Sequence, residues 1–155
     1  MFRLQNDVIR ALFLSPPDPQ IGFTASIPHK TQTSGHIGFF SVSSNVGGDF
    51  DATSGEFVCT RPGVYFFDVN LLAYIGVSTN WTYASCSIYH NDKVLSHAMV
   101  QPEVPRNQSV FYPATGSAYV HLSTGDKVYL GGCTVADSMN GYSSFTGYLV
   151  KADCF

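Results

Sequence analysis

The sequence carries little charge, and what it lacks excludes several classes of protein. Of its 155 residues, 8 are Lys or Arg and 11 are Asp or Glu, so charged residues make up 12%, about half of the usual ~25%. The positive residues form no block, whereas a nucleic-acid surface needs clustered Lys and Arg. No apolar run approaches the roughly 18 residues of a membrane-spanning helix. We therefore expect no nucleic-acid partner and no membrane insertion.

Motifs for catalysis and metal binding are also missing. The chain has no Gly-x-Ser-x-Gly elbow, no phosphate-binding glycine loop and no His-Glu-x-x-His pair. Its four cysteines contain no Cys-x-x-Cys pair, and the closest two, Cys133 and Cys154, are 21 residues apart, which does not suit a structural zinc site. We expect no enzyme and no cofactor. A Ser-His-Asp triad assembles in space and has no fixed spacing in a sequence, so the sequence alone does not decide whether one is present.

The sequence does contain the alternation of β-strands. After Pro62-Gly63, which have the chemistry of a tight turn, every second residue is apolar: Tyr65, Phe67, Val69, Leu71 and Ala73. This period of two predicts a strand with one buried face. Similar short runs recur about every ten residues between turn residues, and this spacing predicts an all-β sandwich or jelly roll.

The same pattern predicts where the strands lie. The expected strands are residues 21–27, 36–43, 50–59, 64–75, 81–90, 94–100, 118–122, 127–134 and 143–151. We expect three hairpins, which turn at Pro62-Gly63, at residues 91–93 and at residues 124–126. Tyr129 alternates with Val128 and Leu130 and is expected to face away from the core.

Three segments resemble the C1q globular domain family. Residues 50–67 are similar to its signature, Phe-(Asn/Asp)…Thr-Gly-x-Phe-x-Cys-x-x-Pro-Gly-x-Tyr-x-Phe, although Ser54 splits the Thr-Gly pair. Residues 116–130 and 142–150 resemble its late Gly-Asp turn and its final strand, in the same order. The resemblance covers roughly residues 20–151. It implies a ten-stranded jelly-roll sandwich of C1q/TNF type over residues 20–155, and a homotrimer.

Residues 1–19 lie outside the resemblance and are predicted to be a helical arm followed by a proline-rich linker. Leu4, Val8 and Ala11 have the spacing of a coiled-coil seam, and the prolines at 16, 17 and 19 end any helix. Two interpretations remain open: the tail of an oligomerising neck, or a short, loosely packed arm.

For the cysteines, the resemblance implies two disulfides, Cys86–Cys133 and Cys59–Cys154. The alternative is that one or more are buried free thiols, above all Cys59, whose position is often an unpaired cysteine in the family. Asn80 and Asn107 begin Asn-x-Ser/Thr sequences and would accept N-glycans if the chain enters the secretory route.

Some members of the family hold calcium near the trimer axis through aspartates between the fifth and sixth strands. The corresponding residues here, 96–108, contain Glu103 as their only carboxylate. Because Ca²⁺ needs six to eight oxygen ligands, we expect no metal at that place.

Three loops, at residues 78–83, 102–112 and 136–142, combine aromatic rings with hydrogen-bonding side chains. This mixture suits a carbohydrate. The candidate ligand-binding residues are Trp81, Arg106, Asn107, Tyr112, Asn140 and Tyr142. Arg106 is the only arginine in these loops and could fork the carboxylate of an acidic sugar. Trp81 could equally be a core residue, and Arg106 a solvated charge.

These observations and the resemblance together imply a secreted, extracellular, non-enzymatic recognition domain that acts as a homotrimer. Glycans such as sialic acid, or microbial surface molecules, are the expected ligands, as for stand-alone C1q-domain proteins of invertebrates, among them sialic-acid-binding lectins. Two alternatives remain, a trimeric signalling ligand for a cell-surface receptor and the structural head of a matrix protein, because function lies in loops carried by the fold.

Overall fold

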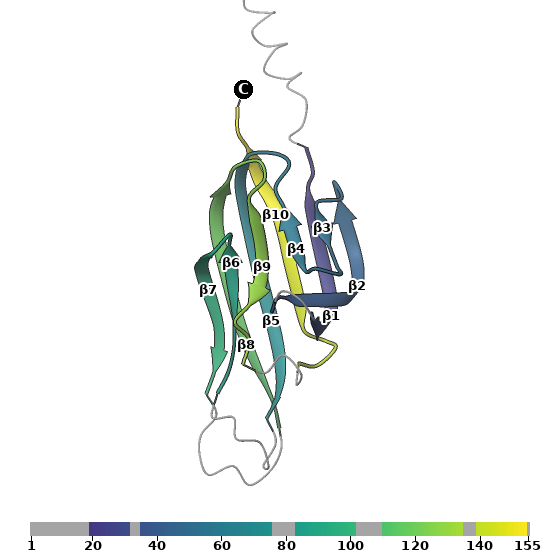
Figure 1. Cartoon of the computed structure of the whole chain (residues 1–155), viewed down its shortest axis with the longest axis vertical. Helices are drawn as coiled ribbons and strands as arrows, with labels where there is room; N and C mark the ends of the chain where they lie inside the picture. Colours follow the sequence, from purple (N-terminus) through teal and green to yellow (C-terminus); the bar gives the residue numbers. More distant parts are fainter. Residues whose placement is uncertain (1–18, 32–34, 76–82, 102–109, 135–138, 155) are drawn as a thin grey trace, which may run out of the picture.

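Ten strands form two five-stranded antiparallel sheets in the part of the chain that the computed structural model describes, residues 19–31, 35–75, 83–101, 110–134 and 139–154 (Figure 1). Sheet A contains, in spatial order, β2 (Ile37–Val46), β1 (Gly22–Lys30), β10 (Ser144–Ala152), β5 (Gly63–Ile75) and β8 (Val110–Leu122). Sheet B contains β3 (Phe50–Asp51), β4 (Glu56–Val58), β9 (Lys127–Gly131), β6 (Ala84–His90) and β7 (Lys93–Val100). The jelly-roll sandwich expected from the sequence is confirmed.

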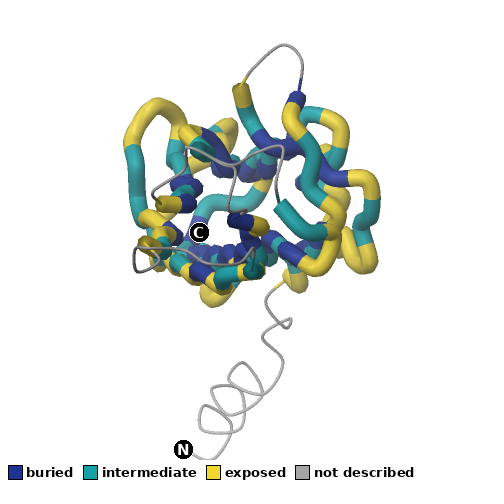
Figure 2. The backbone as a smooth tube through the Cα atoms, turned by 90° about the horizontal axis from the view of Figure 1, so that it is seen from below, coloured by how far each residue is buried: buried dark blue, intermediate teal, exposed yellow. Residues whose placement is uncertain are grey.

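The core lies between the sheets and is built around the alternation of β5. Tyr65, Phe67 and Val69 are 0% exposed, so the face predicted from the sequence is confirmed. Phe23 of β1 stacks on Phe50 with ring centroids 4.0 Å apart. Figure 2 shows the buried positions of both sheets alternating with exposed ones along the strands.

Two of the three expected hairpins are wrong. The Pro62-Gly63 turn connects β4 of sheet B to β5 of sheet A, and the turn at residues 124–126 connects β8 of sheet A to β9 of sheet B. Both turns carry the chain across the sandwich, because the strands on either side face the same core from opposite layers. The third expectation is confirmed: β6 pairs with β7 across residues 91–92, where His90 opposes Lys93.

Among the expected strands, those at 50–59 and 118–122 differ most from the structure. The strand expected at 50–59 is divided into β3 and β4 by a turn whose Gly55 has φ +72°, and a Cβ there would collide with the carbonyl of Ile37. The strand expected at 118–122 begins already at Val110. Pro113 argued against a strand at this position, because proline is rare inside a sheet. β8, however, is an edge strand, where a proline can lack its amide hydrogen without loss of a ladder bond.

The cysteines follow the expectation only in part. Cys86 of β6 forms a disulfide with Cys133, which follows β9. Cys59 and Cys154 are not joined to each other: Cys59 is a buried free thiol and Cys154 an exposed one. The Cys59 thiol points into the core, 3.2 Å from the Arg61 carbonyl, and burial raises its pKa. Cys154 lies beyond the end of β10 and does not reach it.

The Gly125-Asp126 turn is held by the aspartate side chain. Its carboxylate accepts hydrogen bonds from the Ser123 amide at 2.9 Å and from Asn91 Nδ2 at 3.2 Å, and lies 3.0 Å from His90 Nε2. The Ser123 amide in particular lowers the pKa of Asp126 below its ordinary value. The side chain therefore connects the β8–β9 turn to the end of β6.

We expect Phe67→Ala to lower the free energy of unfolding by about 3–5 kcal/mol, the cost of a large cavity in an aromatic core. Tyr129→Ala should cost less, because the Tyr129 side chain lies on the outer face of sheet B. Chemical denaturation of both variants measures the two changes. The reverse order would show that the assigned faces are shifted by one residue.

We expect Asp126→Asn to lower the free energy of unfolding by about 1 kcal/mol near neutral pH. A pKa lowered by folding stabilises the native state above the unfolded-state pKa, and this contribution is lost as the pH falls through the folded-state pKa. The difference between wild type and variant should therefore shrink below the ordinary Asp pKa of 3.8. Asp92→Asn, at an exposed position in the β6–β7 turn, is the control. A difference that stays constant down to pH 2 would contradict the assignment.

Candidate recognition surface

The outer face of sheet A carries a row of aromatic residues. Phe66 of β5 opposes Tyr148 of β10 on one side and Tyr119 of β8 on the other. The rings of Phe66 and Tyr148 are 5.6 Å apart, Tyr119 is 67% exposed and Tyr148 is 47% exposed. Each strand directs these side chains outward because their sequence neighbours, such as Phe67 and Tyr65, face the core. The result is an exposed apolar row across three strands.

Farther along the same face a polar band separates this row from a second apolar group. The band contains Asp68, Asn70, Thr115, Ser117, Ser144 and Thr146, which are paired across β10, β5 and β8. Asn70 donates a hydrogen bond to Asp68 at 2.6 Å. Beyond the band, Tyr74 and Phe111 oppose each other with ring centroids 5.3 Å apart, and both are more than 40% exposed. Along the strands, the outer face of sheet A therefore presents an apolar row, then a polar band, then a second apolar pair.

An open groove of about 380 Å³ continues the aromatic row toward β1 and β2. Ile21, Val46 and Tyr148 line it together with Gly22. A Cβ on Gly22 would lie 3.0 Å from the Cβ of Tyr148, so the glycine keeps the groove beside the tyrosine open. Apolar surface of this kind, in one continuous stretch, marks sites of association more often than ordinary exposed surface.

Three of the predicted ligand residues lie within the described structure, and they have different environments. Tyr112 opposes Ala73 and packs against the small buried cluster of Ala73, Ile75 and Ala84, so it faces inward. Asn140 Oδ1 accepts a hydrogen bond from the Tyr142 amide at 2.9 Å and shapes the turn before β10. Tyr142 itself is 88% exposed.

The remaining predicted ligand residues, Trp81, Arg106 and Asn107, lie outside the described residues, as does the other glycosylation candidate, Asn80. The described structure therefore singles out Tyr142 as the accessible member of the predicted set. It also contains an exposed aromatic residue that the sequence reasoning missed: Phe40 on β2 is 75% exposed. The signal was present, because consecutive Phe39 and Phe40 in a strand must face opposite sides.

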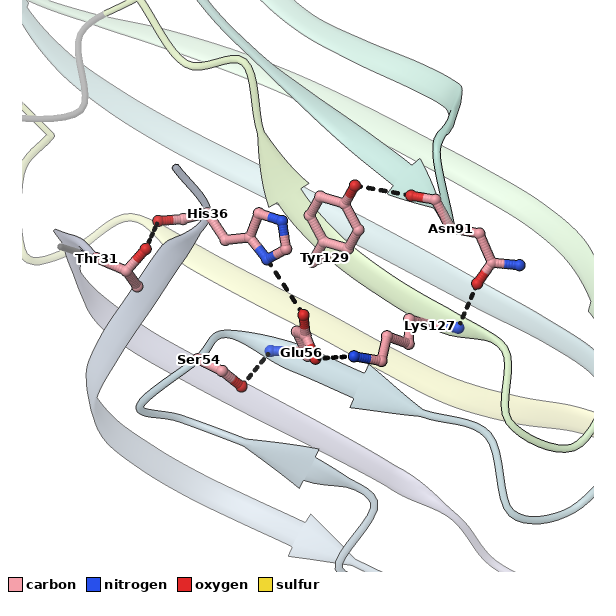
Figure 3. Close-up of polar contacts among 7 residues, drawn as sticks. All are labelled: Thr31, His36, Ser54, Glu56, Asn91, Lys127 and Tyr129. Carbon is pink, nitrogen blue, oxygen red and sulfur yellow. Dashed lines mark hydrogen bonds and ion pairs between the residues drawn. The ribbon is translucent and has the colours of Figure 1, made fainter. Parts of the chain in front are cut away.

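The outer face of sheet B is organised differently, by polar groups that satisfy one another (Figure 3). Glu56 on β4 contacts Lys127 Nζ at 2.8 Å and His36 Nδ1 at 3.4 Å. The His36 ring stacks on Tyr129 with centroids 3.7 Å apart, and the Tyr129 hydroxyl donates to the Asn91 carbonyl at 2.7 Å. Glu56 raises the pKa of Lys127, and burial raises that of Tyr129.

This network connects the two sheets rather than offering groups to a ligand. His36 precedes β2 of sheet A and forms an isolated backbone bridge with Gly131 of β9 in sheet B. Its side chain then reaches Glu56 and Tyr129 on the same sheet. Because the donors and acceptors are used within the chain, we assign the network to stability.

A Ser-His-Asp triad would need a histidine in contact with both a serine and a carboxylate. His90 and His121 contact Asp126 and Asp153, at 3.0 and 2.9 Å. His97 contacts a serine, Ser87, at 2.8 Å, and no carboxylate of the described segments joins that pair. Within the same segments no group of three His, Cys, Asp or Glu side chains could hold a metal ion, and no helix is long and apolar enough to cross a membrane.

Comparison with known proteins agrees with this architecture. The C1q domain family matches residues 22–150. Complement C1q tumor necrosis factor-related protein 3 of Homo sapiens is 29% identical over 138 residues, which are 87% of this chain and 53% of that protein. The related protein 6 of Rattus norvegicus is 29% identical over 120 residues, 74% of this chain and 43% of that protein. The chain spans about half the length of these curated relatives.

A solved structure shares the fold. The globular domain of the zebrafish complement 1qA protein superimposes with a TM-score of 0.66 at 21% sequence identity. The match covers 88% of this chain and 100% of that domain.

Proposed function

The chain belongs to the C1q domain family, and from this membership we propose that it is an extracellular, non-enzymatic recognition domain that acts as a homotrimer. The observation that carries the proposal is the outer face of sheet A. Its aromatic row and the adjoining groove expose apolar side chains that a lone chain would leave in water. Residues 20–155 form the recognition domain, and residues 1–19 act as an arm and linker that precede it.

A ring of three copies explains the shape of this surface. The aromatic row, Tyr148–Phe66–Tyr119, and the groove beside β1 and β2 share Tyr148, but the row extends to β8 and the groove to β2, so the face has two different ends. Two different patches that meet in neighbouring copies generate a closed ring if the rotation closes. The polar band beyond the row would then sit within the assembly or at its rim, where hydroxyls and amides can pair with one another.

We expect the protein to sediment at about three times the 16.9 kDa chain mass, and to do so in excess EDTA, because the sequence of residues 96–108 contains a single carboxylate, Glu103. Tyr119→Arg should shift the population toward monomer by placing a charge in the apolar row. Asp92→Arg, at an exposed position in the β6–β7 turn, should leave the trimer intact. A monomeric wild type, or a trimer lost on chelation, would contradict this assembly.

For the ligand, we propose a glycan, with an acidic sugar as the preferred class. Tyr142 supports this proposal, because its aromatic ring is 88% exposed and can stack on the apolar face of a sugar. The hydrogen bond from its amide to Asn140 Oδ1 fixes the turn that carries it. Arg106, Asn107, Trp81 and Asn140 complete the proposed set of contacts. Tyr112, on β8, contributes by packing against Ala73, Ile75 and Ala84 rather than by contact with the sugar.

The alternative is a trimeric ligand for a cell-surface protein receptor. The observation that favours it is the match to two C1q tumor necrosis factor-related proteins over most of the described domain. The same assembly and the same exposed loops would serve either function, so the difference lies in the chemistry of what binds.

Calorimetry with acidic and neutral sugars separates the two. Arg106→Lys keeps the charge but loses the planar fork, so it should weaken an acidic sugar more than a neutral one. Tyr142→Ala should weaken both. If the wild-type trimer binds no glycan below about 10 mM, which corresponds to ~2.7 kcal/mol, the glycan proposal fails and the receptor ligand replaces it.

A further inference from the structure

Two aromatic side chains, one on sheet A and one in the turn before its strand β10, are the most exposed large hydrophobic residues of the described chain. Tyr142, in the turn before β10, is 88% exposed, and Phe40, on β2, is 75% exposed. β1 lies between them, since Ser26 on β1 opposes Ser41 on β2 and Ser144 on β10. Two strand spacings therefore separate the two segments, about 10 Å.

The local structure holds Phe40 outward. Phe39 is 4% exposed and belongs to the core, so the alternation of β2 directs Phe40 to the opposite side. The His29 ring lies against Phe40 with centroids 4.2 Å apart. Gly38 makes room for this contact, because a Cβ there would lie 2.6 Å from His29 Cε1. An aromatic face is thus supported from one side by an imidazole.

The turn that bears Tyr142 is fixed to β1 at a strained residue. The Ile27 amide donates a hydrogen bond to the Gly141 carbonyl at 3.2 Å. Ile27 has φ +57°, a conformation that is a genuine outlier for a β-branched side chain. Such strain collects at functional sites, where the surrounding structure maintains it. Here it positions the backbone between the two aromatic residues.

The groups between the rings are hydroxyls. Ser26 and Ser144 are paired across β1 and β10, and each faces outward because Ala25 and Phe145 beside them are 0% exposed. A protein partner or a second copy would favour a continuous apolar surface, such as the Tyr148–Phe66–Tyr119 row. Two separate rings with hydroxyls between them instead match a chain of sugar units, which presents apolar C–H faces to rings and hydroxyls to serines.

We propose that Phe40 and Tyr142 form the two ends of one oligosaccharide-binding site, with Ser26, Ser144 and His29 as hydrogen-bonding partners. The site takes a glycan of at least two sugar units, because a single unit cannot span from one ring to the other. This inference rests on the proposed glycan binding and names its contact surface.

The test compares saturation-transfer NMR and calorimetry for sialyllactose, lactose and diacetylchitobiose with their constituent monosaccharides. Wild type should bind at least one of the oligosaccharides about tenfold more tightly than its monosaccharides. Phe40→Ala and Tyr142→Ala should each weaken that oligosaccharide about tenfold and the monosaccharides much less. Met99→Ala, an exposed apolar residue on sheet B, is the matched control and should change neither.

The outcomes separate this inference from the proposed function. Glycan binding that survives both Phe40→Ala and Tyr142→Ala overturns the site but leaves glycan recognition in place. A wild type that binds none of the sugars overturns both. Sedimentation of the two variants, with circular dichroism to verify folding, completes the test: a shift of Phe40→Ala to monomer would assign this surface to contacts between copies and overturn the site.

Discussion

The alternation of β5 is the constraint on which the rest of the structure depends. One set of its residues, Tyr65, Phe67 and Val69, fills the core between the sheets, and the intervening set, Phe66, Asp68 and Asn70, faces outward on sheet A. β5 also has β8 and β10 as direct neighbours, so its register sets theirs. A shift by one residue would exchange the two faces, and core and outer surface would be lost together.

Periodicity predicted which way side chains face but not which strands pair. The alternation after Gly63 and the outward position of Tyr129 needed only local information, as did the turn at residues 91–92. The partners of β4 and β8 depend on contacts distant in sequence, and a tight turn looks the same whether it joins two strands of one sheet or crosses a sandwich. The expected Cys59–Cys154 disulfide was wrong for a related reason, because the direction of the Cys59 thiol depends on the β4–β5 crossing, whereas the alternative of a buried free thiol is confirmed.

For the candidate site, residue type alone could not separate surface contacts from packing. Tyr112 and Tyr142 both looked like ligand residues, but Tyr112 continues the inward face of an edge strand that was predicted too short. Phe40 was overlooked because aromatic pairs in strands suggest core, although only one member of such a pair can be buried from one side. Arg106, Asn107 and Trp81 remain predictions.

The two outer faces of the sandwich divide its chemistry. On sheet B, Glu56, Lys127, His36 and Tyr129 satisfy one another, so these groups are used within the chain. On sheet A, the aromatic row is continuous, whereas Phe40 and Tyr142 are separated by serines. A continuous row suits association between copies, and separated rings suit a sugar chain. Assembly and ligand binding can therefore share one sheet, because different spacings of aromatic residues along and across its strands select different partners.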